Sequence, residues 1–224
     1  MVWALVGVVV IAAVVRLWNI NQLPPGFWYD EANKSVVALQ IARGQRFPIY
    51  VTDYQGEAGY FWLLAAWFRV FGASFYGTRY VAAVLGTATI PLTYWAVSTH
   101  YRSQPNSRWL GLAAAGWLSF LLWHVLFSRL GLEIIAVPMF AIAMLGLMAK
   151  AWQRQKAWIF ALAGAVLGLS LNINPAARVL PLQALLLPVL LLVRAPFPPP
   201  AVVQALVSQS DAGRRPRRGR LARA

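Results

Sequence analysis

Long apolar stretches joined by short polar connections are the feature that most constrains how this chain can fold. A helix needs about 20 mostly apolar residues to cross the hydrocarbon core of a bilayer. Charged residues make up only 12% of the sequence, against about 25% in soluble domains, so polar groups cannot cover a globular surface. The sequence therefore predicts an all-α integral membrane protein. The stretches that compete as spans are 2–15, 58–71, 80–97, 109–127, 134–149, 157–171 and 179–193.

Basic residues outnumber acidic ones by 20 to 6. Such an excess also suits nucleic-acid binding, but no stacking platform or groove-reading motif accompanies it. The cations lie instead in connections between apolar stretches and in the C-terminal segment 214–223. Because basic clusters of this kind mark the cytoplasmic side of membrane proteins, we expect the lipid bilayer, and no nucleic acid, to be the partner of these charges.

Short basic connections set the expected orientation. Segments 100–108 and 150–156 are basic, and so is the C-terminal tail. If all three are cytoplasmic, six helices cross the membrane, both termini are cytoplasmic, and 58–71 is an interfacial or re-entrant helix. Seven crossings with an external N-terminus remain the alternative. The six predicted spans are 2–15, 80–97, 109–127, 134–149, 157–171 and 179–193.

The six-span arrangement places a long loop, 16–79, on the outer face of the cell (inner) membrane. Within this loop, 31–43 is expected to form a short interfacial helix that stops at Gly44, because glycine favours the end of a helix. Residues 1–193 then form one multi-span membrane domain. The remaining segment, 194–224, is rich in Pro and then in Arg, which predicts a disordered tail and indicates a truncation or a shifted reading frame.

Two adjacent acids, Asp30 and Glu31, follow an aromatic run at 27–29 in the outer loop. One interpretation is structural: Asp30 caps a helix, Glu31 complements the helix dipole, and Lys34 pairs with Asp30 one turn later. The other interpretation is catalytic. A carboxylate in a partly dry site beside a membrane span can have a raised pKa and act as a general base, and the aromatic run could bind the face of a sugar.

A second group of polar residues lies at the outer end of a predicted span. His124 and Ser128 share a helix face, and Arg129 and Glu133 are spaced for an ion pair. A structural hydrogen bond is the simpler explanation for His124. For Arg129 and Glu133 a functional role has equal weight, because ionisable groups at a lipid boundary are costly and are usually paired or functional.

A third candidate, Arg178, follows a turn that contains a proline at the end of a predicted span. Its guanidinium either clamps a phosphate or extends to the lipid headgroups. Asp53 and Glu57 flank a turn in the outer loop and give a weaker indication of a substrate contact. The sequence has no P-loop, zinc motif, nucleophile elbow or Gly-rich dinucleotide loop, which excludes most classes of soluble enzyme.

These motifs together resemble the GT-C membrane glycosyltransferases, in particular the protein O-mannosyltransferase and aminoarabinose-transferase group, described as dolichyl-phosphate-mannose-protein mannosyltransferase-like. The resemblance covers roughly residues 10–185, and its most specific motif is the Asp-Glu pair after the aromatic run. Members of this group are usually about twice as long, so it is their N-terminal part that the chain resembles. The carrying residues are Arg16, Leu23-Pro24, 27–31, 42–44, Phe71-Gly72 with Arg79, Ser128-Arg129 with Glu133, and 175–181.

The resemblance implies an inverting transferase that moves a hexosyl or pentosyl group from a polyprenyl-phosphate carrier to an acceptor protein or glycolipid at the outer face. Asp30 stands at the position of the family's loop acid, with Glu31 beside it, and both are the expected catalytic residues. A divalent metal, if one is used, is expected at this pair. The expected substrate-binding residues are Tyr29, Lys34, His124, Arg129, Glu133 and Arg178.

Two other classes of function stay open, a transporter or flippase subunit and a non-catalytic membrane scaffold. Transporters usually carry polar or broken segments at mid-span and an inverted repeat. Here the middles of the predicted spans are nearly all apolar, interrupted mainly by Pro91 and Pro138. The ionisable residues gather toward one predicted face, which favours chemistry at the membrane surface over transport through it.

Overall fold

The computed structural model describes residues 1–52 and 56–194. Within these ranges the chain is almost entirely helical, with one short antiparallel strand pair. It divides into two compact units, 1–184 and 185–224, and the second is described only as far as Arg194. The predicted tail and Asp53 lie outside the described residues. The elements are α1 (Val2–Leu17), α2 (Tyr29–Ala42), β1 (Tyr50–Val51), β2 (Gly56–Glu57), α3 (Gly59–Phe71), α4 (Gly77–His100), α5 (Ser107–Phe120), α6 (Leu122–Arg129), η2 (Glu133–Ile135), α7 (Ala136–Arg154), α8 (Ala157–Leu171), η3 (Pro175–Val179) and α9 (Leu180–Arg194).

Two helical segments of the described chain, Gly77–His100 and Glu133–Arg154, are long and apolar enough to cross a membrane. A third candidate is the pair α5 and α6, which is bent by 58°. Every other expected span also coincides with a helix, but these helices are shorter. The 16 residues of α1 extend about 24 Å, against a hydrocarbon core of about 30 Å. Helix length therefore establishes two or three candidate spans, fewer than the six predicted.

The expected span 109–127 is two helices rather than one, because the chain breaks at Leu121. A break leaves backbone carbonyls at the end of α5 without helical N–H partners. The side chain of Arg16, fully buried at the end of α1, donates one hydrogen bond to the carbonyl of Ser119 and another to Ser128 Oγ. Arg16 thereby supplies donors at the break and ties α1 to both halves of the bent pair.

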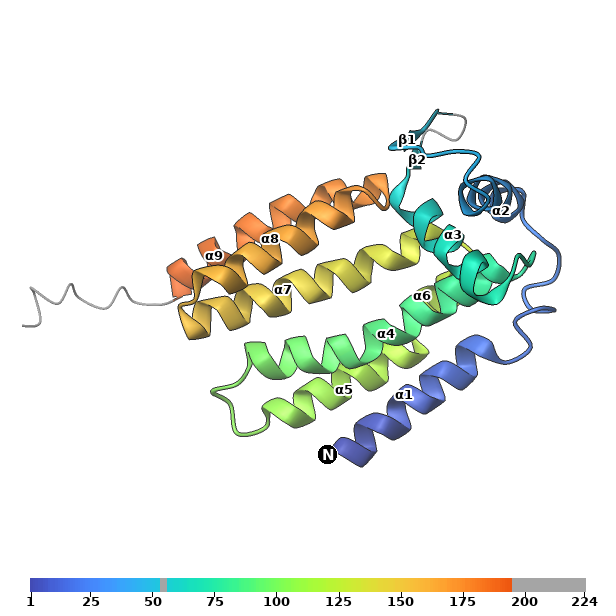
Figure 1. Cartoon of the computed structure of the whole chain (residues 1–224). Coiled ribbons are helices and arrows are strands. Elements are labelled where there is room, and N and C mark those ends of the chain that lie inside the picture. Colours follow the sequence, from blue (N-terminus) through green and yellow to red (C-terminus); the bar gives the residue numbers. More distant parts are fainter. Residues whose placement is uncertain (53–55, 195–224) are drawn as a thin grey trace, which may run out of the picture. The chain divides into compact units, whose positions relative to one another are not determined.

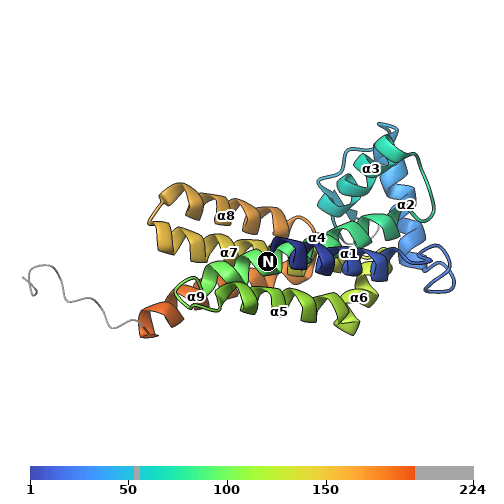
Figure 2. The same ribbon diagram turned by 90° about the horizontal axis from the view of Figure 1, so that it is seen from below.

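Helix α4 is the centre of the helical arrangement in residues 1–184. It packs against α1, α5, α6 and α7, while α8 packs against α7. Figures 1 and 2 show α4 running alongside α5 and α7. This packing places the start of α4 next to the start of α7 and the end of α6, where the polar residues of the second predicted group lie.

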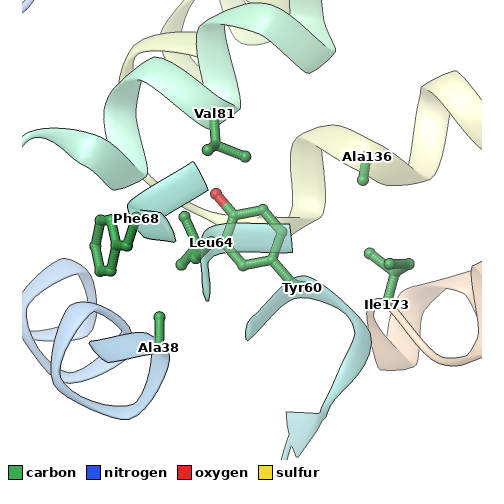
Figure 3. Close-up of a cluster of buried hydrophobic side chains, with 7 residues drawn as sticks. All are labelled: Ala38, Tyr60, Leu64, Phe68, Val81, Ala136 and Ile173. Atoms are coloured by element: carbon green, nitrogen blue, oxygen red, sulfur yellow. The ribbon is translucent and has the colours of Figure 1, made fainter. Parts of the chain in front are cut away.

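Helices α2 and α3 pack together across the beginnings of α4 and α7. Figure 3 shows the buried apolar cluster at this junction, with the ring of Tyr60 and Leu64 of α3 in its middle. Helix α3 exposes Leu63 and Val70 outside this cluster. The cluster consists of Ala38, Tyr60, Leu64, Phe68, Val81, Ala136 and Ile173.

The described acidic residues all lie at one end of this helical arrangement, together with eight Lys and Arg, whereas the described charged residues at the other end are all basic. One end, which we call the acidic end, is where α1 finishes, α4 and α7 begin, and α2 and α3 lie (Figure 1). All acidic residues of the described chain belong to it, namely Asp30, Glu31, Glu57 and Glu133. The other end, the basic end, is where α4 and α7 finish and α5 and α8 begin. It carries Arg102, Arg108, Lys150, Arg154 and Lys156.

Candidate active site at the acidic end

Arg79 is the centre of a buried polar cluster beside the predicted catalytic acids. It lies in the first turn of α4, and its side chain is fully buried. Its Nε donates to Glu31 Oε1 at 2.9 Å and its Nη2 to Glu31 Oε2 at 3.1 Å, which is the two-point geometry of a strong Arg–carboxylate pair. The remaining N–H groups donate to the carbonyls of Ile20, Pro24 and Gly26. Arg79 therefore holds the loop between α1 and α2 against α4.

The Glu31 carboxylate is surrounded by hydrogen-bond donors. The backbone N–H groups of Trp28 and Gly131 donate to it at 3.0 and 2.9 Å, in addition to Arg79. Burial by itself raises the pKa of this carboxyl, but the hydrogen bonds from Arg79, Trp28 and Gly131 and the charge of Arg79 outweigh burial, so the net pKa is lowered. Glu31 therefore holds its charge and joins three separate chain segments.

Gly131 is required at this junction by close packing. A Cβ atom at position 131 would collide with the side chain of Thr78 and would lie 3.1 Å from Glu31 Oε1. Only a glycine lets the backbone N–H of residue 131 come near enough to the buried carboxylate to donate to it.

Asp30 stands next to this cluster but in a different environment. The helix begins at Tyr29, with Trp28 as its N-cap residue, so Asp30 is the second residue of α2 and not its cap. The N–H of Trp28 is bound by Glu31 instead. The Asp30 side chain is exposed, and no ion pair engages it within residues 1–52 and 56–194.

A cavity of about 160 Å³ opens beside Asp30. Its walls come from α2, from β2 with the first turn of α3, from η2, and from the connection between α8 and η3. Segments far apart in the sequence therefore meet at one polar opening at the acidic end. The lining residues are Asp30, Asn33, Lys34, Gly56, Glu57, Phe61, Glu133, Ile173 and Pro175.

The other two acids of the cavity are paired with cations. Lys34 Nζ lies 2.6 Å from Glu133 Oε2. Arg178 Nη2 lies 2.8 Å from Glu57 Oε1, with 69% of the Arg178 side chain exposed. Of the acids that line the cavity, Asp30 is the one whose charge no described ion pair balances.

Two expected side-chain pairs are wrong. Helix α6 ends at Arg129, and the chain turns through 130–132, so Glu133 is not one helical turn beyond Arg129. Glu133 pairs with Lys34 instead, and this pair also takes the place of the expected Asp30–Lys34 pair.

Arg129 has a structural environment at the end of α1. Its side chain donates to the carbonyls of Val15 and Trp18, both at 2.7 Å, and to those of Arg16 and Leu23. Carbonyls at the C-terminus of a helix lack intrahelical partners, and Arg129 supplies donors to several of them.

The remaining predicted site residues lie outside the cavity. His124 is buried, and its Nδ1 lies 2.9 Å from Arg16 Nη2, at the break between α5 and α6. Tyr29 is 78% exposed and is not among the lining residues. The structure thus brings Asp30, Lys34 and Glu133 together around one cavity, with Arg178 beside it through Glu57.

Asn33 is a lining residue that the sequence prediction missed. Its Nδ2 and the Oε2 of Glu57 are buried without a hydrogen-bond partner among the described residues. Buried polar atoms in native proteins usually have partners, so such atoms at the edge of a cavity favour a polar ligand or ordered water there. The helical spacing from Asp30 was the signal that could have identified Asn33, since residues three apart share a face.

The expected metal pair does not fit this arrangement. Both oxygens of Glu31 face N–H donors, so a cation at Asp30 and Glu31 would have to displace Arg79. Within the part of the chain that the structure describes, no group of three or more His, Asp or Glu side chains could hold a metal ion.

No family model, no curated protein and no solved structure matches this chain. The class of the site therefore rests on its own residues and geometry. The resemblance to the GT-C glycosyltransferases stays a prediction from the motifs.

Proposed function

We propose that this chain is a membrane glycosyltransferase of the GT-C type, which transfers a sugar from a polyprenyl-phosphate carrier to an acceptor hydroxyl with inversion at the anomeric carbon. The observation that carries the proposal is the state of Asp30. It is an exposed carboxylate without a described ion pair, at a polar cavity whose other acids are paired. A general base needs such a group, within reach of substrate and free to accept a proton.

The orientation we propose follows the distribution of charge. The basic end faces the cytoplasm and the acidic end faces outward, because short basic connections such as 100–108 and 150–156 stay on the cytoplasmic side. Six of the eight Lys and Arg at the acidic end lie in the loop 16–79, and long loops cross the membrane largely regardless of their charge. In this arrangement the chain is a multi-pass protein of the cell (inner) membrane with six crossings and both termini in the cytoplasm. Helices α2 and α3 then lie at the outer surface, where the cavity is open to a lipid-linked donor.

The chemistry we propose is a single displacement. The Asp30 carboxylate takes the proton of the acceptor hydroxyl while the acceptor oxygen forms a bond to the anomeric carbon. The bond from that carbon to the carrier phosphate breaks, and the electron pair leaves with the phosphate oxygen. Cations near the leaving group favour this step because they stabilise the charge that develops on it.

The hydrogen bonds and ion pairs that each residue already makes indicate its role in this scheme. Arg129 is committed to four backbone carbonyls, so we assign the phosphate to Arg178, whose exposed guanidinium needs only to share its pairing with Glu57. Lys34 and Glu133, paired with each other, also line the cavity. Glu31 is a positioning residue in this scheme, because its bonds to Arg79 fix the first turn of α2 and hence the backbone of Asp30.

The apolar walls and unpartnered atoms of the cavity suit a sugar. Phe61, Ile173 and Pro175 offer surface to the C–H face of a ring. Asn33 Nδ2 is a donor and Glu57 Oε2 an acceptor, and a hydroxyl group can satisfy either one.

The test uses the full chain in lipid nanodiscs with synthetic polyprenyl phosphates that carry mannose, glucose or arabinose. The readout is release of free polyprenyl phosphate in the presence of a membrane protein extract as acceptor. We expect turnover with at least one donor and a loss of about 100-fold or more in Asp30→Asn, since a positioned base contributes roughly 10²- to 10⁴-fold. The melting temperature should not change. Asp211→Asn makes the same chemical change outside the described residues and is the control.

Two outcomes would overturn the proposal. One is an Asp30→Asn variant with the rate of the unmodified chain. The other is an absence of turnover with every donor. If the chain then moves fluorescent polyprenyl phosphate between leaflets, the transporter or flippase function replaces the transferase. If the chain is inactive in both assays, a non-catalytic membrane scaffold is the remaining class of function.

A further inference from the structure

The basic end brings together two connections that are about 50 residues apart in the sequence. One follows α4 and contains Arg102, and Arg108 begins the next helix. The other follows α7 and contains Lys156, with Arg154 in the last turn of α7. These four side chains are exposed. The segments 97–110 and 150–158 contain no Asp or Glu, so no carboxylate within them balances this charge.

Three contacts that follow one another along the two helices hold the ends of α4 and α7 side by side. A Cβ atom at Gly146 would collide with the ring of Trp95, so the two helices approach each other closely at this glycine. One turn further along α7, Lys150 Nζ lies 5.9 Å from the centroid of the same ring. Nearer the end, Gln153 Nε2 donates to the carbonyl of Thr99. The two basic connections therefore form one surface rather than two.

Exposed aromatic side chains surround this surface. Trp109 and Trp158 are each 63% exposed, and Tyr101 and Trp152 are also exposed. Tryptophan and tyrosine prefer the headgroup layer of a bilayer, where the ring meets hydrocarbon and the polar atom meets water. In a bilayer, cations beside such rings are placed at the depth of the lipid phosphates.

We infer that the basic end is a docking surface for anionic phospholipid headgroups, made by Arg102, Arg108, Lys150, Arg154 and Lys156 together. Charge complementarity supports this occupant, because the surface concentrates positive charge, has no carboxylate in segments 97–110 and 150–158, and carries exposed Trp and Tyr side chains that prefer the headgroup layer. The inference depends on membrane insertion and is independent of sugar transfer.

The experiment measures retention of phosphatidylglycerol and phosphatidylcholine with identical acyl chains by native mass spectrometry of the purified full chain. Each cation near a charged membrane surface contributes about fivefold in affinity. The double variant Arg154→Gln, Lys156→Gln is therefore expected to bind phosphatidylglycerol roughly 25-fold more weakly, with phosphatidylcholine unchanged. The double variant Arg43→Gln, Arg69→Gln removes the same charge from exposed positions at the acidic end and should change phosphatidylglycerol binding little.

Three results would overturn the inference. One is an equal loss of phosphatidylglycerol binding in the two double variants, which would indicate a general effect of net charge. Another is displacement of the lipid by millimolar inorganic phosphate, which would identify a site for a soluble anion. A third is tighter binding of a short RNA than of phosphatidylglycerol vesicles to the basic end. If the double variant fails to insert, the single variant Arg102→Gln, expected to lose about fivefold, provides the same comparison.

Discussion

The guanidinium of Arg79 and the carboxylate of Glu31 form a fully buried pair, with Nε 2.9 Å from Oε1, that joins the first turn of α4 to the first turn of α2. Glu31 is the sequence neighbour of Asp30, so the pair fixes the backbone from which the candidate base extends. A buried charge pair of this kind adds little net stability by itself, but loss of one partner leaves the other charge buried and uncompensated.

Glu31→Gln is expected to lower the free energy of unfolding by about 3 to 5 kcal/mol, because Arg79 then lacks its counter-charge. Glu57→Gln is the matched control. Its partner Arg178 is mostly exposed and can be rehydrated, so we expect a loss below about 1 kcal/mol. Unfolding of both variants in detergent, followed by tryptophan fluorescence, gives the comparison. Equal losses would show that the Arg79 pair has no special structural role.

The stability of the folded chain should rise with pH across the acidic range. The pKa of Glu31 is lowered in the folded state relative to an ordinary value of about 4.3, so the unfolded chain binds more protons in this window. The contribution of Glu31 is complete above the unfolded pKa and is lost as the pH falls through the folded one. Melting temperatures from pH 3 to 7 should show this dependence, and Glu31→Gln should flatten it. If the melting temperature falls with a midpoint above about pH 5, the result would contradict a lowered pKa of Glu31.

Arg16→Met should destabilise the break between α5 and α6. The substitution keeps an apolar chain of similar length but removes the donors to Ser119 O and Ser128 Oγ. Each buried group left without a partner costs about 1 to 3 kcal/mol. Arg108→Met, at an exposed position of the basic end, should change stability by less than about 0.5 kcal/mol. Denaturation of both variants in the same detergent measures the difference. An Arg16→Met variant as stable as the unmodified chain would refute the role of Arg16 at the break.

Gly131→Ala should cost about 1 to 3 kcal/mol, because the added methyl group overpacks the junction of Thr78 and Glu31. Gly116→Ala is the matched control. No atom lies within 4 Å of a Cβ at position 116 in α5, and alanine favours a helix, so this variant should be neutral or slightly more stable. Thermal unfolding of the two variants measures the difference. Equal melting temperatures would mean that the close approach at Gly131 does not constrain the fold.

The proposed orientation can be measured directly, because the chain has no native cysteine. We expect Asn21→Cys, at the acidic end, to react with an impermeant maleimide added outside intact cells. Gln104→Cys, at the basic end, should react only after the membrane is opened. Both positions are exposed, so a difference in reactivity reports the side of the membrane. Labelling of both from the same side would rule out the orientation.

Local signals in the sequence predicted much of the secondary structure. The apolar stretches coincide with helices, the two short amphipathic segments became α2 and α3, and the Asp-Glu pair starts a helix. These features depend on the composition and spacing of neighbouring residues, which a sequence displays directly. The predicted Arg129–Glu133 pair was wrong because helical spacing was extended across the turn that follows α6. The predicted Asp30–Lys34 pair was wrong because Glu133, distant in the sequence, pairs with Lys34 instead.

The sequence by itself determined that the chain is helical and apolar, that its few acids are concentrated outside the predicted spans, and that Asp30 belongs to the candidate site. Only the tertiary structure decided the different environments of Asp30 and Glu31. One carboxylate is exposed at a cavity, and the other is buried against Arg79, 48 positions along the chain. The physical reason is that burial and charge pairing depend on which distant segments meet, and helical periodicity describes only residues within a turn or two of one another.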